Sequence, residues 1–124
     1  MTIRPRRSVL YMPGSNARAL EKAKTLSTDA VILDLEDSVA PDAKVTARDQ
    51  VMAVAKAGGF GSREVVIRVN GLSGPWGVAD LEAAAAVAPD AILIPKVSKP
   101  ADVFEAVAVL DRLGAPESVK IWAM

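Results

Sequence analysis

The stretch Val31-Ile-Leu-Asp-Leu-Glu-Asp-Ser-Val-Ala-Pro41 joins an apolar run to three carboxylates. Its first five residues are apolar apart from Asp34 and show no polar alternation, which is typical of a parallel strand covered on both faces. Asp34, Glu36 and Asp37 place three carboxylates within four positions. They lie at the carboxyl end of the strand, where catalytic and ligand-binding residues of α/β proteins are usually found. Capping of the next helix by Asp37 or Ser38 would account for one carboxylate but not for three. The segment therefore predicts a functional site.

The composition limits the classes of protein to which this chain can belong. The 124 residues suffice for at most one domain, and 51% of them are hydrophobic, which argues against a disordered chain. Lys plus Arg and Asp plus Glu number 15 each, so the net charge gives no general attraction to nucleic acid. The absence of cysteine and histidine excludes disulfides, thiolate metal sites and a Ser-His-Asp triad within the chain. No run reaches the length of a membrane span and no apolar signal core begins the chain, so a cytoplasmic protein is expected.

Short apolar runs alternate with helical patterns along the whole chain. Strands are expected at residues 8–12, 31–35, 64–70, 91–96 and 119–124, and helices at residues 15–26, 42–57, 78–88 and 99–113. A repeat of about 30 residues is the size of one βαβ step, so the pattern predicts right-handed crossovers and a parallel sheet in chain order. Polar residues after four strand ends favour a (β/α)8 barrel, truncated to about four and a half β/α units. On length alone, a flavodoxin-like five-stranded sheet is the alternative.

Arg68 interrupts a strand that is otherwise apolar. A buried arginine needs a partner, and the carboxylates of the neighbouring strand supply one. One interpretation is a structural ion pair of Arg68 with Asp34 or Glu36. The other interpretation, which we favour, is that the guanidinium makes a bidentate hydrogen bond to a carboxylate or carbonyl of a substrate. In either case Arg68 and at least one acid are expected on one face of the sheet, because alternate strand residues share a side.

Two further segments supply candidate ligand-binding residues. Pro13-Gly14-Ser-Asn16 follows the first expected strand and would place free backbone N–H groups at a helix N-terminus, with Arg18 nearby, an arrangement that suits an anion. Lys96 ends the fourth expected strand. Lys44 and Arg48 lie four residues apart on one helix face, for which exposure to solvent is the default expectation. The chain has no Walker motif and no GxGxxG motif.

Six segments together resemble the family of citrate lyase beta subunits and malyl-CoA lyases, within the HpcH/HpaI aldolase group. They are RRSVLYMPGSN (6–16), LDLEDSVAP (33–41), KVTAR (44–48), VIRVN (66–70), PWGVADL (75–81) and ILIPKV (92–97). They occur in the family's order and spacing and cover nearly the whole chain. The resemblance implies a TIM barrel of the phosphoenolpyruvate/pyruvate type, assembled into trimers or hexamers. Residues 1–124 are then expected to be the N-terminal half of a single barrel domain.

The resemblance also implies an activity and roles for particular residues. The reaction would be Mg²⁺-dependent carbon–carbon cleavage or formation in 3-hydroxyacyl-CoA thioesters of the malyl, citramalyl or citryl type, through a metal-bound keto acid and an acyl-CoA enolate. Arg68 matches the arginine that holds the keto acid, and Glu36 and Asp37 match acids that line the metal site through water or an arginine. The turn at residues 13–16 matches the loop near the entrance for CoA and substrate. The family's two metal-binding acids would fall beyond Met124, so the chain alone is expected to hold no metal ligand and to be inactive.

Two other functional classes stay open. A related acyl-CoA thioesterase would use the same site, but water would hydrolyse the product, so that no thioester is released. A non-catalytic half-barrel fragment would bind or assemble without turnover.

Overall fold

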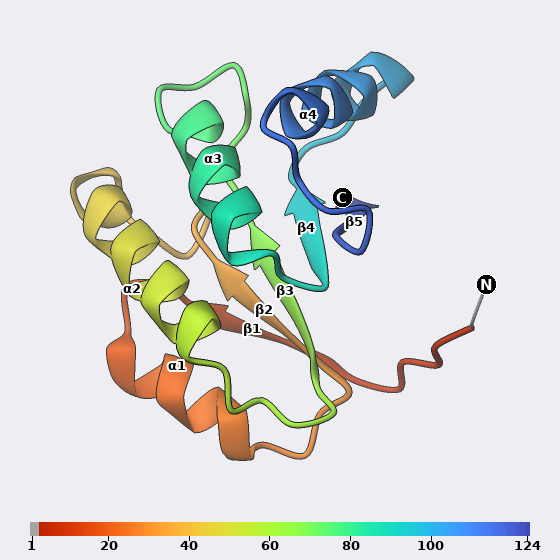
Figure 1. Ribbon diagram of the computed structural model, residues 1–124. Helices are drawn as coiled ribbons and strands as arrows, with labels where there is room; N and C mark the ends of the chain where they lie inside the picture. Colours follow the sequence, from red (N-terminus) through yellow and green to blue (C-terminus); the bar gives the residue numbers. More distant parts are fainter. Residues whose placement is uncertain (1–2) are drawn as a thin grey trace.

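The computed structural model describes residues 3–124 as strands and helices that alternate along the chain (Figure 1). The strands are β1 (Val9–Pro13), β2 (Ala30–Asp34), β3 (Glu64–Arg68), β4 (Ala91–Ile94) and β5 (Lys120–Ala123). The α-helices are α1 (Ala17–Lys22), α2 (Lys44–Ala57), α3 (Gly77–Val87) and α4 (Pro100–Arg112), and short 3₁₀ turns follow α1 at η1 (Ala23–Thr25) and precede α2 at η2 (Pro41–Ala43). The predicted strand–helix alternation is confirmed.

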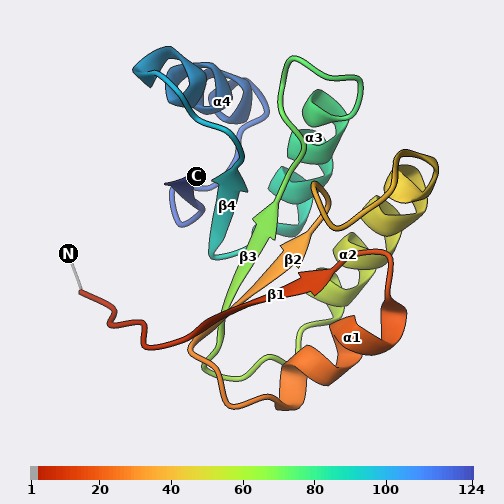
Figure 2. The same ribbon diagram turned by 180° about the vertical axis from the view of Figure 1, so that it is seen from behind.

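The five strands form one parallel sheet in the order β1-β2-β3-β4-β5. The arrowheads of β2, β3 and β4 point toward the same edge of the sheet in both the front and the rear view (Figures 1 and 2). This chain-order arrangement confirms the prediction and contradicts the flavodoxin-like alternative, in which the first strand lies inside the sheet between the second and third. The carboxyl ends of the strands, and the segments that follow them, therefore meet at one edge.

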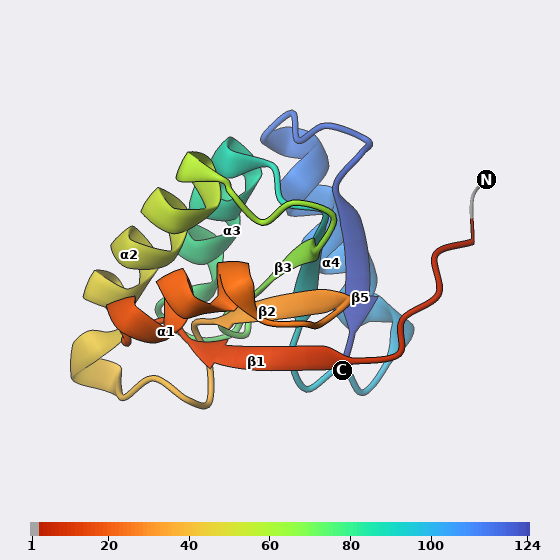
Figure 3. The same ribbon diagram turned by 90° about the horizontal axis from the view of Figure 1, so that it is seen from below.

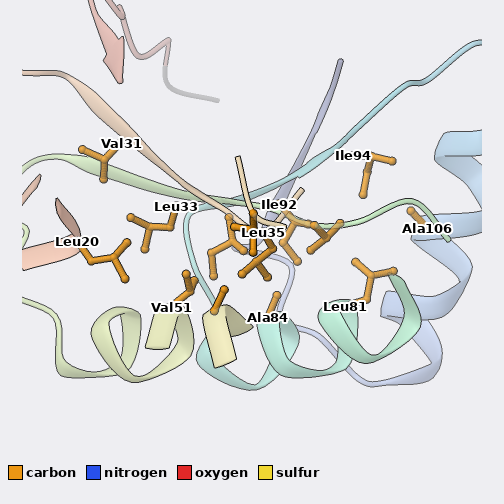
Figure 4. Packing of buried hydrophobic residues seen from close by; sticks show 14 of the residues in the cluster. Leu20, Val31, Leu33, Leu35, Val51, Leu81, Ala84, Ile92, Ile94 and Ala106 are labelled. Carbon is orange, nitrogen blue, oxygen red and sulfur yellow. The ribbon is translucent and has the colours of Figure 1, made fainter. Parts of the chain in front are cut away.

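The two faces of the sheet are covered differently. On one face, strand side chains such as Leu33, Leu35 and Ile92 form a core with buried residues of the helices, and Figure 4 shows Val51 and Leu81 pointing toward them. Helices α1, α2 and α3 lie side by side over this core (Figure 3). The other face carries a smaller cluster that consists only of strand residues, namely Ile32, Val66, Ala91 and Leu93, with Trp122 packed against it. This is the face toward which Asp34 and Arg68 point, because they alternate with the core residues.

The local sequence explains where the helices begin and end. The side chain of Asn16 caps α1 by accepting a hydrogen bond from Ala19 N at 3.0 Å, as its position before the helix predicts. Helix α1 ends at Lys22 and continues to Thr25 as 3₁₀ helix, so the α-helical part is shorter than expected. Gly58, with φ of 70°, ends α2 in a backbone conformation that favours glycine.

Within the described residues, no helix is both long enough and apolar enough to cross a membrane.

Candidate active site

Asp34 and Arg68 pair directly at the carboxyl ends of β2 and β3. The two residues are register partners in adjacent parallel strands, so their side chains leave the same face side by side. Arg68 donates from Nε to Asp34 Oδ1 and from Nη2 to Asp34 Oδ2, both at 2.7 Å, in a bidentate pair. Both side chains are almost completely buried. The structural ion pair that the sequence left open is therefore present, and the expectation that Arg68 shares a face with an acid is confirmed.

Asp34 also holds the turn that follows β2. Its carboxylate accepts hydrogen bonds from Glu36 N at 2.9 Å, Ser38 N at 3.1 Å and Ser38 Oγ at 2.6 Å. Burial by itself raises the pKa of Asp34, but the hydrogen bonds from Arg68 and Ser38 outweigh it and lower the pKa to about 2. Asp34 is therefore a permanent anion that stabilises the site and is not suited to donate a proton near neutral pH.

Arg68 keeps one nitrogen that Asp34 does not use. Its Nη1 lies 3.5 Å from Glu36 Oε1, too long for a hydrogen bond, and 3.5 Å from the sulfur of Met124. The guanidinium also lies over the ring of Tyr11, 4.8 Å from its centroid. The hydrogen bond to Asp34 raises the pKa of Arg68, with a smaller contribution from the charge of Glu36, and burial opposes the rise. Arg68 thus remains charged, and Nη1 is the guanidinium nitrogen that Asp34 does not occupy, on the sheet face that α1, α2 and α3 do not cover.

Glu36, Asp37 and Lys96 meet beside this pair. Lys96 Nζ donates to Glu36 Oε2 at 2.6 Å and lies 3.7 Å from Asp37 Oδ1. The side chain of Glu36 is 9% exposed, whereas those of Asp37 and Lys96 are 72% and 75% exposed. The hydrogen bond to Glu36 raises the pKa of Lys96. The structure therefore brings Arg68, Glu36, Asp37 and Lys96 together from three strand ends, and only Asp37 and Lys96 face freely into solvent.

A cleft of about 930 Å³ opens over the segments that follow β2, β3 and β4. These segments gather at the top of Figure 1. Residues that line the cleft include Glu36, Asp37, Lys44, Asn70, Trp76 and Lys96. Arg68 is not among its lining residues, and its guanidinium lies near Tyr11 and Met124 on the sheet face that α1, α2 and α3 do not cover. Glu36 links Arg68 to the cleft, since its carboxylate lies 3.5 Å from Arg68 Nη1 and also lines the cleft.

Lys44 and Arg48 are not on a solvated face, so that expectation was wrong. Lys44 is 7% exposed, and its ammonium donates to Leu35 O, Glu36 O and Asn70 Oδ1 at 3.1, 2.9 and 2.8 Å. A lysine can fill this position because its flexible stem carries three donors to three oxygens.

Arg48 binds a second buried acid next to this group. It donates from Nε to Asp80 Oδ1 at 2.7 Å, while Asp80 Oδ2 accepts from the backbone N and side-chain Nδ2 of Asn70. A polar network thus joins α2, α3 and the end of β3 directly beneath the cleft. The i, i+4 spacing could be read from the sequence, but the depth of the two side chains depends on tertiary packing.

The turn at Pro13–Asn16 is more closely packed than an anion cradle requires. Gly14 N donates to Asp34 O at 2.8 Å and Asn16 N donates to Pro13 O at 3.1 Å, so these two N–H groups are not available to an anion. Gly14 is buried, and a Cβ at this position would lie only 2.5 Å from Asp34 O, so no larger residue fits without a shift. Arg18 lies exposed on α1. The substrate contacts expected of Pro13, Gly14 and Arg18 remain predictions.

The residues present do not form a magnesium site by themselves. Within residues 3–124 no group of three or more acidic side chains has the arrangement of a metal site. Of the two candidate acids, Glu36 is already held by Lys96 and faces Arg68, and Asp37 projects into solvent. Hard oxygen ligands suit Mg²⁺, but two carboxylates so engaged do not make a complete ligand set.

The sequence profile of the HpcH/HpaI aldolase/citrate lyase family matches residues 7–118. The chain belongs to this family. The match covers all four α-helices and the first four strands. The Asp34–Arg68 pair, Glu36 and Lys96 all lie inside the matched segment of this aldolase/citrate lyase family member.

Named relatives within the family differ in their reactions. The chain is 52% identical over 120 residues to a (3S)-malyl-CoA thioesterase of Cereibacter sphaeroides, with 97% of this chain and 40% of that protein covered. It is 39% identical over 102 residues to citrate lyase subunit beta of Escherichia coli, with 82% and 34% covered. The chain therefore spans about 40% or less of the length of these relatives.

A solved structure shares this arrangement. The crystal structure of protein CitE from Mycobacterium tuberculosis in complex with magnesium, acetoacetate and coenzyme A matches with a TM-score of 0.67 at 29% identity. The match covers 91% of this chain and 38% of that one.

Proposed function

We propose that the whole protein acts on 3-hydroxyacyl-CoA thioesters of the malyl-CoA type and cleaves their carbon–carbon bond in the manner of a citrate lyase beta subunit. The observation that carries the proposal is the state of Arg68. Its fork is held by Asp34, yet Nη1 has only the Met124 sulfur and Glu36 Oε1 near it, each at 3.5 Å, on the sheet face that α1, α2 and α3 do not cover. A guanidinium fixed in this way offers a preorganised positive edge to the carboxylate or carbonyl oxygen of a keto acid.

The remaining residues of the site have supporting roles in this proposal. Asp34 orients Arg68 without changing its own protonation, because its pKa is held near 2. Glu36 places negative charge beside the guanidinium, and Asp37 and Lys96 add an anion and a cation at the rim of the cleft. The turn at Pro13 and Gly14, together with the exposed Arg18, is proposed to lie at the entrance for the CoA portion.

The fold, cofactor and assembly implied by the family are part of the same proposal. We propose that β1 to β5 are the first strands of a (β/α)8 barrel and that residues 1–124 form its N-terminal half. Magnesium would be held by acids outside residues 3–124, since the described acids do not complete a site. The crystallised CitE protein contains magnesium and coenzyme A, which supports this cofactor and this class of substrate. A homotrimer or homohexamer is the proposed assembly and the cytoplasm the proposed location.

Thioester hydrolysis is the second candidate reaction. It is favoured by the 52% identity to a (3S)-malyl-CoA thioesterase, which exceeds the 39% identity to citrate lyase subunit beta. Both reactions use the same substrate class and the same arginine.

One assay separates the candidates. The complete protein is incubated with malyl-CoA and Mg²⁺, and free CoA thiol, acetyl-CoA and glyoxylate are quantified together. A lyase releases acetyl-CoA and glyoxylate in equal amounts without free thiol, whereas a thioesterase releases free thiol and malate. If neither set of products forms with malyl-, citramalyl- or citryl-CoA, the proposed function is wrong.

A further inference from the structure

The backbone of Lys96 lies in the left-handed region, which is unfavourable for a residue that has a Cβ. Its φ is 53°, and within residues 3–124 only Ala88, with φ of 48°, is another non-glycine residue in this left-handed region. A residue with a Cβ is disfavoured there, and such residues persist where their surroundings hold them. The side chain of Lys96 is 75% exposed, so burial does not compensate for the unfavourable backbone. The contact that the conformation does produce is the short hydrogen bond to Glu36.

Glu36 lies between two cations that approach opposite oxygens. Lys96 Nζ is 2.6 Å from Oε2, and Arg68 Nη1 is 3.5 Å from Oε1. Only the first of these distances is a hydrogen bond, so Lys96 holds the carboxylate more firmly than Arg68 does. Lys96 follows β4, which ends at Ile94, whereas Arg68 is the last residue of β3 and Glu36 follows β2.

The position of Glu36 decides whether Arg68 is free to bind. Asp34 already uses Nε and Nη2, and Nη1 has only a long, weak contact with the Met124 sulfur at 3.5 Å, so Nη1 is the nitrogen left for a ligand. Without the ammonium of Lys96, the Glu36 carboxylate would have Arg68 as its nearest cation, and a small rotation would close the 3.5 Å gap to Nη1. An intramolecular carboxylate would then compete with the carboxylate of a substrate for the same donor.

We propose that Lys96 is a positioning residue that draws Glu36 away from Arg68 and thereby keeps one guanidinium edge open for the anionic group of an α-keto acid. This inference rests on the proposed function, because it assigns the open edge to the keto-acid portion of the substrate. Lys96 acts through Glu36 and not by contact with the ligand.

The test is a double-mutant cycle on ligand binding in the complete protein. Lys96→Gly removes the side chain and suits the left-handed backbone, and Glu36→Gln removes the competing charge. Glyoxylate binding in the presence of Mg²⁺ is measured by calorimetry. Lys96→Gly alone should weaken binding about tenfold, the scale of one charge-assisted hydrogen bond. In the Glu36→Gln background, Lys96→Gly should cause little further loss, and Lys96→Arg should retain most of the affinity.

Two binding outcomes would overturn the proposal. If Lys96→Gly weakens binding by the same factor in both backgrounds, Lys96 acts on the ligand independently of Glu36. If Lys96→Gly leaves the affinity unchanged in the wild-type background, Glu36 does not compete for Arg68. Ala88→Gly is the matched control, since it relieves the same kind of backbone at the end of α3, outside the site, and should leave binding unchanged.

Unfolding measurements keep the test independent of the activity. Lys96→Gly should unfold at a higher urea concentration than Lys96→Ala, because alanine keeps the unfavourable φ. The effects of Lys96→Gly and Glu36→Gln on unfolding should be non-additive, since the two side chains are bonded. Strict additivity overturns the proposal even if glyoxylate does not bind. Wild-type protein that neither binds glyoxylate nor turns over any of the thioesters contradicts the proposed function, while non-additive unfolding would still support the Lys96–Glu36 contact.

Discussion

Asp34→Asn tests whether the Asp34 carboxylate holds the ends of β2 and β3 together. The substitution keeps the shape of the side chain and removes the charge that faces Arg68. The pKa of Asp34 is about 2 against an ordinary value of 3.8, which corresponds to about 2 kcal/mol at about 1.4 kcal/mol per unit. The variant also leaves the buried guanidinium without its anion, and such losses cost about 3–5 kcal/mol. We therefore expect the free energy of unfolding to fall by about 3 kcal/mol or more at pH 7.

Urea unfolding followed by far-UV circular dichroism measures this loss. Ser38→Ala is the matched control, because it removes one hydrogen bond to Asp34 and leaves the ion pair, at a cost of about 1 kcal/mol. If Asp34→Asn costs no more than Ser38→Ala, the ion pair does not stabilise the site and the reasoning is refuted.

The same pair predicts a pH dependence with a definite sign. Because folding lowers the pKa of Asp34, its contribution to stability is complete above pH 3.8 and is lost as the pH falls toward 2. The difference in unfolding free energy between wild type and Asp34→Asn should therefore shrink as the pH is lowered from 5 to 2. A difference that stays constant over this range would contradict the assignment of the low pKa to Asp34.

Three further predictions concern neighbouring residues. Arg68→Lys in the complete enzyme should lower the catalytic constant about a hundredfold or more, because lysine keeps the charge but not the planar fork; full turnover per folded molecule, with only a lower melting temperature, would show that Arg68 is a structural counter-ion. Gly14→Ala should lower the free energy of unfolding by about 1–3 kcal/mol, since the added Cβ would lie 2.5 Å from Asp34 O and 2.8 Å from Val51 Cγ2; an unchanged thermal midpoint would contradict this close packing. Lys44→Met should cost about 2 kcal/mol or more, because two backbone carbonyls and one amide oxygen would lose their donor; urea unfolding with no loss would show that water replaces the ammonium.

The secondary structure and the order of the sheet were the features best predicted from the sequence, because they follow from a local hydrophobic pattern that repeats along the chain. The apolar runs with intervening helical patterns predicted a parallel sheet in chain order, and the structure has that order. Strand ends were less well predicted: the third strand ends at Arg68 and not at Asn70, whose side chain donates to Leu35 O and to Asp80. Those partners lie 35 and 10 residues away, so no pattern within the strand could reveal them.

The sequence singled out charged residues that the structure brings together at the strand ends, but it did not show which of them pair. Asp34, Glu36 and Arg68 could be selected because charged residues are unusual at the ends of apolar strands. Which acid holds the fork of Arg68 depends on the register between β2 and β3, and the structure pairs it with Asp34. Lys44 was assigned to solvent because helix spacing alone does not show which side chain reaches under the neighbouring strand ends.

The sequence was enough to predict the alternation of elements, the direction of the strands and the end of the sheet at which the charged residues gather, because periodicity and chain connectivity limit these features. It also determined the family, since six short segments occur in a specific order. The tertiary structure decided that Asp34 is a buried counter-ion and that Glu36 is held between Lys96 and Arg68. It likewise decided that Lys44 is buried beneath the cleft. These features depend on distances between side chains from different strands and helices, and such distances exist only once the sheet has formed and the helices have packed against it.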